Sequence, residues 1–163
     1  YEYLEARKGI RTLNGNPIPT ELLESQKIIG KLPQSQVLTL DEIEQARETL
    51  LNHQDHEAVL IIALGLATAF TGKKSSYSEI HYYGFEILLS LPKEMVFPVL
   101  NHIIKYSRME YSLRRSIEVQ ETLYKYMDNP ELWQTKTERM SQWLARRTAS
   151  VQPSAQATSS GEL

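Results

Sequence analysis

Residues 58–70 read Ala-Val-Leu-Ile-Ile-Ala-Leu-Gly-Leu-Ala-Thr-Ala-Phe, and this run is apolar on every face that a helix would present. As a helix it spans roughly 20 Å, at a rise of about 1.5 Å per residue. The hydrocarbon core of a bilayer is about 30 Å thick, so the run is too short to cross it. A helix that is hydrophobic all round and does not span a membrane must be enclosed by other parts of its protein. The run therefore predicts a buried central helix.

Helix-capping residues divide the flanking sequence into amphipathic helices. A Ser or Thr followed three positions later by Glu is a capping box, in which each side chain bonds the other residue's backbone N–H. Asp and Asn are further preferred N-caps, and Pro is favoured at the first helical position. Together with the break at Pro92, these signals predict six helices that start near Thr39, Asp55, Ser76, Met95, Ser107 and Asn129. Gly72 is expected to end the central helix, because glycine readily adopts the left-handed conformation found there.

The chain is therefore predicted to be all-α, with about six helices in three antiparallel hairpins around a buried central helix. The hairpins start near residues 40, 77 and 109, a spacing of roughly 32 to 37 residues that is also typical of stacked helical-hairpin arrays. A compact bundle and a short helical-repeat array are thus the two alternatives. The central helix, being apolar on all faces, favours the bundle.

The two ends differ from this body in composition. Residues 1–38 contain the extended stretch Asn16-Pro17-Ile18-Pro19, and we expect an N-terminal arm with one or two short helices that lies on the helical body or on a partner. Residues 39–147 form the α-helical domain. Residues 148–163 are rich in Ser, Ala, Thr and Gln without apolar periodicity, and this composition predicts a disordered tail.

Composition narrows the classes of function. The chain has 163 residues, of which 41% are hydrophobic and 23% are charged, as is usual for a globular protein. The net charge of −2 provides no whole-chain argument for binding nucleic acid or an anionic membrane. The absence of cysteine rules out disulfides, thiolate catalysis and cysteine-ligated metal sites. It also fits a reducing compartment, and with no signal-peptide pattern in the sequence we expect a cytoplasmic protein.

One cluster of potential metal ligands lies at a helix junction. His53 and His56 form an H-x-x-H pair with Asp55 and Glu57 beside them, and imidazole and carboxylate are competent ligands for divalent metals. The spacing straddles a helix break, and the sequence specifies no third ligand. Capping and solvation explain these residues better, so we predict no metal site, no cofactor and no catalytic residue. A small helical metalloenzyme is the weakest of the functional alternatives.

Tyrosines, tryptophans and arginines mark a predicted protein-binding surface. Adjacent residues on a helix diverge by about 100°, so one of Tyr82 and Tyr83 is expected to point away from the core. The last helix carries an aromatic stripe containing Trp143, and its outer side has no following helix to cover it. An aromatic centre with a cationic rim is typical of interfaces. The predicted partner-binding residues are Tyr82, Tyr111, Arg139, Trp143 and Arg146.

The leading hypothesis is a non-enzymatic protein–protein interaction, adaptor or scaffold module that binds a protein partner or a second copy of itself. The alternative is a nucleic-acid-associated accessory protein, because residues 90–147 contain ten Lys and Arg against seven Asp and Glu. Clustered cations of this kind can contact phosphates. The candidate residues are Lys105, Arg108, Arg114 and Arg115. Glutamates interleaved among them favour an ion-paired, solvated surface instead.

Overall fold

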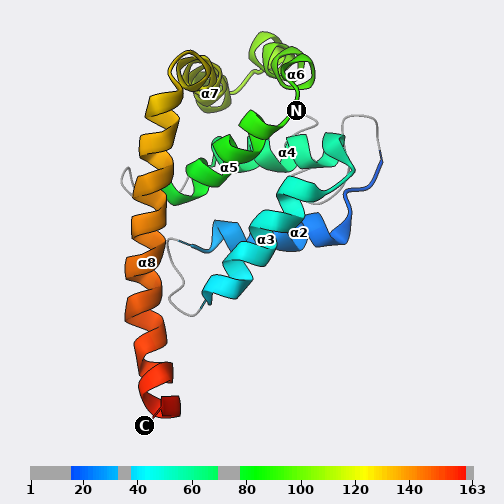
Figure 1. The fold of residues 1–163 in the computed structure, drawn as a ribbon. Coiled ribbons are helices and arrows are strands. Elements are labelled where there is room, and N and C mark those ends of the chain that lie inside the picture. Colours follow the sequence, from blue (N-terminus) through cyan, green and yellow to red (C-terminus); the bar gives the residue numbers. More distant parts are fainter. Residues whose placement is uncertain (1–15, 33–37, 70–77, 161–163) are drawn as a thin grey trace.

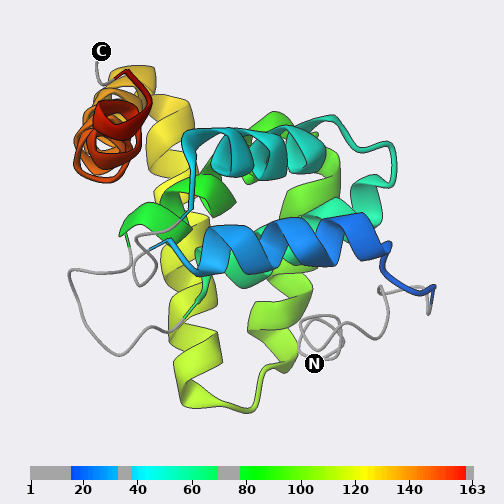
Figure 2. The ribbon, with the colours of Figure 1, turned by 90° about the horizontal axis from the view of Figure 1, so that it is seen from below.

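The computed structural model describes residues 16–32, 38–69 and 78–160, with side chains described as far as Arg147. Within these ranges the chain forms seven helices and no strand, so the predicted all-α fold class is confirmed (Figures 1 and 2). The helices are α2 (Thr20–Gly30), α3 (Leu40–Asn52), α4 (His56–Ala67), α5 (Ser78–Ser90), α6 (Lys93–Tyr106), α7 (Glu110–Asp128) and α8 (Pro130–Ser160). The predicted capping box at Ser76 and the helix end at Gly72 lie outside the described residues.

Two of the predicted helix starts are confirmed by their hydrogen bonds. Thr39 and Glu42 form a reciprocal capping box at the start of α3, with the Glu42 carboxylate accepting from the Thr39 backbone N–H at 2.8 Å. Asp55 accepts from the Ala58 backbone N–H at 3.2 Å and caps α4. The predicted box at Ser107 is wrong: the backbone is still extended there, α7 begins three residues later, and the Ser107 hydroxyl donates to the Met109 carbonyl.

The central helix is α4, in which every residue from Ala58 to Ala67 is buried. Both α2 and α5 pack against it. A glycine at position 84 of α5 allows the two backbones to approach closely, since a Cβ added there would stand 2.5 Å from the Ala67 nitrogen. None of the described helices combines the length and the apolar character needed to cross a bilayer.

The helices pair differently from the prediction. The extensive contacts between consecutive helices join α2 to α3, α4 to α5 and α6 to α7, so each hairpin is shifted by one helix along the chain. The cause is α2, whose Leu22 and Ile29 are fully buried in the common core. The described part of residues 1–38 therefore lies on the helical body, which is one of the two placements predicted for it, and it forms an integral layer of that body.

The last helix lies along one side of the body. In Figure 1 α8 runs past the start of α5, and its C-terminal part extends beyond the other helices. The backbone of α8 is helical through Ser160, whereas composition predicts a disordered tail over residues 148–163. Ser and Thr outnumber Ala and Gln in this segment and Pro153 lies within it, so intrinsic helix propensity does not account for the helix there.

Candidate partner-binding site between α5 and α8

Aromatic stacking joins α8 to α5. The ring of Tyr82 stacks on that of Trp133 with centroids 4.9 Å apart and planes within 5° of parallel, and the Tyr82 hydroxyl donates to Thr137 Oγ1 at 3.4 Å. Tyr82 is only 8% exposed and Tyr83 only 2%. Both tyrosines are buried, because α8 covers the side of α5 that local periodicity leaves open. Burial raises the pKa of Tyr82.

Beside this stack lies a pocket of about 300 Å³ between α5 and α8. We call it the α5–α8 pocket. Its lining residues are Glu79, Tyr82, Lys136, Arg139, Met140, Gln142, Trp143 and Arg146. Four of the five predicted partner-binding residues are among them, although Tyr82 contributes as a largely buried wall and not as an exposed contact.

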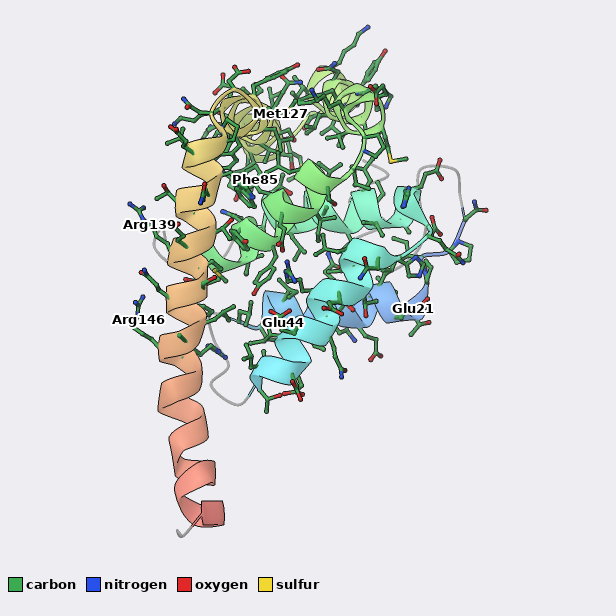
Figure 3. All side chains as sticks on the ribbon, in the orientation of Figure 1. Glu21, Glu44, Phe85, Met127, Arg139 and Arg146 are labelled. Carbon is green, nitrogen blue, oxygen red and sulfur yellow. The ribbon has the colours of Figure 1, made fainter. Side chains whose placement is uncertain are left out.

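Three cations of α8 line one side of this pocket. Lys136, Arg139 and Arg146 line it, and they form no ion pair with any residue that the structure describes. Because residues three, seven and ten positions apart return to the same side of an α-helix, these cations and Trp143 share one face. Figure 3 shows Arg139 and Arg146 projecting from α8 on the side turned away from α2 and α3. The pocket therefore has a concentration of positive charge at its edge.

Arg147 supports the pocket from within the protein. It is 7% exposed, its guanidinium lies 5.4 Å from the centre of the Trp143 ring, and its Nη1 donates to the Leu32 carbonyl at 2.9 Å. Burial lowers the pKa of Arg147, and the charge of Glu79 opposes that change. Sequence reasoning missed this residue. Its spacing of seven from the buried Met140 was the available signal, because that spacing places Arg147 on the core-facing side of α8.

The fifth predicted contact residue lies elsewhere. Tyr111 is 37% exposed near the start of α7 and does not line the α5–α8 pocket. A second pocket, of about 330 Å³, lies among α5, α6 and α7 and has a mostly apolar lining that includes Leu88, Phe97 and Met127. It contains none of the predicted contact residues.

The four candidate residues of the nucleic-acid alternative differ in their contacts within the protein. Arg115 Nη2 donates to the Ala67 carbonyl at the end of α4 at 2.6 Å, and its Nη1 bonds Glu118. Arg114 pairs with Glu110 at 2.9 Å. Lys105 lies 5.4 Å from the centre of the Tyr106 ring, and Arg108 is exposed in the connection between α6 and α7. Arg115 thus caps the central helix, where a cation is favourable.

Both ring nitrogens of His53 already have partners. Nδ1 accepts from the Asp55 backbone N–H at 3.0 Å, so in the neutral ring Nε2 carries the hydrogen and donates to Glu21 at 2.9 Å. This bond to His53 lowers the pKa of Glu21. His56 is exposed, and the described residues contain no group of three or more His, Asp or Glu placed to hold a metal ion.

The α5–α8 pocket is therefore suited to bind an apolar group next to negative charge. Tyr82, Met140 and Trp143 provide apolar surface, and the three cations provide donors for carboxylate or phosphate oxygens. Comparison of the chain with protein-family models, with curated proteins and with solved structures finds no match.

Proposed function

We propose that this chain is a non-enzymatic protein-interaction module, used as an adaptor or assembly unit, and that it binds its partner at the α5–α8 pocket. The observation that carries the proposal is the convergence of Tyr82, Trp143, Arg139 and Arg146 on one pocket. Aromatic residues and arginine are enriched where interfaces concentrate their binding energy. The cysteine-free composition supports a cytoplasmic site of action.

The cations at the pocket support a binding role because the fold does not use them. Arg139 and Arg146 are exposed and form no ion pair with the described residues. Arg47, in contrast, clamps both carboxylate oxygens of Glu86 on α5 and holds α3 in place. Substitution of the pocket cations should therefore leave the fold intact while changing what the surface binds.

Site-specific photo-crosslinking tests the proposal. A benzophenone amino acid replaces Thr135, which is exposed on α8 beside Lys136 and one turn before Arg139 but does not line the pocket, and the variant is irradiated in extract of cells that produce the protein naturally. We expect a discrete crosslinked product that disappears in the Arg139→Glu/Arg146→Glu background. The matched control carries the same amino acid at Gln45, which is exposed on α3.

The outcomes separate the functional alternatives. Equal products from positions 135 and 45, or none from position 135, would contradict the proposal. A product of twice the chain mass would identify the partner as a second copy, which light scattering after size exclusion checks independently. A gel shift at low salt with mixed DNA and RNA probes tests the nucleic-acid alternative. Retardation that is lost in Arg108→Glu but kept in Arg139→Glu/Arg146→Glu would favour the α6–α7 cations and that alternative.

A further inference from the structure

We propose that the partner segment that occupies the α5–α8 pocket is acidic. An apolar side chain enters the pocket, and Asp or Glu side chains on either side of it contact Lys136, Arg139 and Arg146. This inference rests on the proposed function and specifies the chemistry of the partner.

The charges at the pocket do not balance. Three cations line it together with one carboxylate, that of Glu79. Glu79 also interacts electrostatically with the buried Arg147 beneath Trp143, a further cation outside the lining. A basic segment would place like charges beside one another, which disfavours binding at an interface. An acidic segment is complementary.

The spread of the cations indicates an extended segment and not a single small anion. Lys136 and Arg146 are ten residues apart on α8, which corresponds to about 15 Å along the helix axis. An extended peptide covers that length with roughly five residues, at about 3.3 Å each. A row of this length offers separate contacts to several carboxylates along an extended segment, more than one carboxylate or phosphate group can use at once.

The size of the pocket fits one anchoring side chain. A volume of about 300 Å³ is at the small end of the range for ligand pockets. Tyr82 and Met140 are themselves buried, and Trp143 is half-buried against Arg147, so the apolar surface is fixed before a partner arrives. A leucine or an aromatic side chain would gain contact with this surface, while the flanking carboxylates would remain at the cationic edge.

Selection from a random peptide library tests the inference. The full chain is immobilised, phage displaying random twelve-residue peptides are selected on it, and the most enriched peptide is labelled with fluorescein. We expect enriched sequences with Asp or Glu beside Leu, Phe, Tyr or Trp. In fluorescence polarisation, binding should weaken between 50 and 300 mM NaCl and should weaken roughly tenfold or more in Arg139→Glu/Arg146→Glu. Lys27→Glu/Lys125→Glu, which reverses two exposed cations on α2 and α7, should bind as the wild type does.

A blocking variant separates failure of this inference from failure of the proposed function. Gln142→Trp fills the mouth of the pocket and should abolish binding of any segment that enters it. Peptides that are blocked by Gln142→Trp but contain no acidic residues would overturn the acidic partner and keep the pocket as the binding site. Peptides whose binding is unaffected by Gln142→Trp and by Arg139→Glu/Arg146→Glu would overturn the inference, and so would the absence of any enriched peptide. In either case the crosslinking experiment alone would decide whether the pocket is the binding site.

Discussion

Gly84 shows how one side chain, or the lack of one, controls the approach of two helices. A Cβ at this position would stand 2.5 Å from the Ala67 nitrogen, 2.8 Å from the Ala67 Cα and 3.0 Å from the Ala63 carbonyl oxygen. All three atoms belong to the backbone of α4, so no side-chain rotation can relieve the contact. Because α4 is enclosed on every side, the helix itself has little room to shift. Alanine is normally the better helix former, but here packing overrides that preference.

We therefore predict that Gly84→Ala destabilises the protein by about 1–3 kcal/mol, the usual cost of overpacking a core, as measured by urea unfolding. Gly30→Ala is the matched control, because a Cβ at that position of α2 meets nothing within 4 Å. It should be neutral or stabilising by less than about 1 kcal/mol. Equal effects of the two substitutions would contradict the close α4–α5 approach.

His81 makes the stability of the protein depend on pH. Its Nε2 lies 2.9 Å from the Ala69 carbonyl oxygen, just beyond the end of α4. Burial lowers the pKa of His81 below the ordinary 6.5, and the charge of Arg115 lowers it further. Between the folded-state pKa and 6.5 the unfolded chain binds more protons than the folded chain does. The free energy of unfolding must therefore rise with pH across that window.

We predict that the contribution of His81 to stability is complete above pH 6.5 and is lost as the pH falls toward the folded-state pKa. Urea unfolding at pH 7.5, 6.5 and 5.5 measures it. His81→Gln, which keeps an N–H donor but does not titrate, should flatten this part of the pH profile. If the profiles of the variant and the wild type ran parallel, His81 would not be the group responsible.

At the scale of elements, α8 has two parts with different roles. Its first part buries Met140 and Arg147 and stacks Trp133 on Tyr82, whereas its end extends beyond the other helices (Figure 1). We predict that truncation after Arg147 leaves the melting temperature unchanged and removes only the circular-dichroism signal of the deleted turns. Truncation after Asp128 should lower the melting temperature sharply, because it exposes the face of α5 that carries Tyr82. A large loss of stability from the shorter truncation would show that residues after 147 support the core.

Local signals predicted the elements better than their partners. Thr39 and Asp55 mark helix starts because a capping bond reaches only three residues along the chain. Glu86 illustrates the limit: it lies on α5, and Arg47 donates to it from α3 at 2.7 Å. Contacts between residues so far apart depend on which helices become neighbours, and periodicity within one helix does not specify that.

In the candidate site, too, local sequence predicts which residues share a helix face but not which helices come together. The spacing of Arg139, Trp143 and Arg146 places them on one side of a helix, and the structure brings them together in one pocket. The burial of Tyr82 was not predictable from its own helix, because it depends on Trp133 arriving from α8. Nor did the sequence indicate that Arg115 caps α4, since that bond joins residues 48 positions apart.

At the scale of the whole molecule, α2 is required for a single core. Leu22, Ile29 and Leu32 are all fully buried, and α2 contacts α3, α4 and α5. We predict that a chain lacking residues 1–38 does not unfold cooperatively in urea and binds the dye ANS, as proteins do when their specific packing is lost. The truncation after Arg147 serves as the control. A cooperative transition in the chain without residues 1–38 would restore the division between an arm and a domain at residue 38.

The bond between Arg147 and the Leu32 carbonyl joins positions 115 residues apart and closes α8 onto the end of α2. Because ribosomes make the chain from its N-terminus, α5 is complete before α8 begins, and the α5–α8 pocket has only one of its two walls until Arg146 has been added. A partner that binds there can engage only molecules that have been translated through Arg147. Under the proposed function, prematurely terminated chains would thereby be kept from the partner without any separate inspection step.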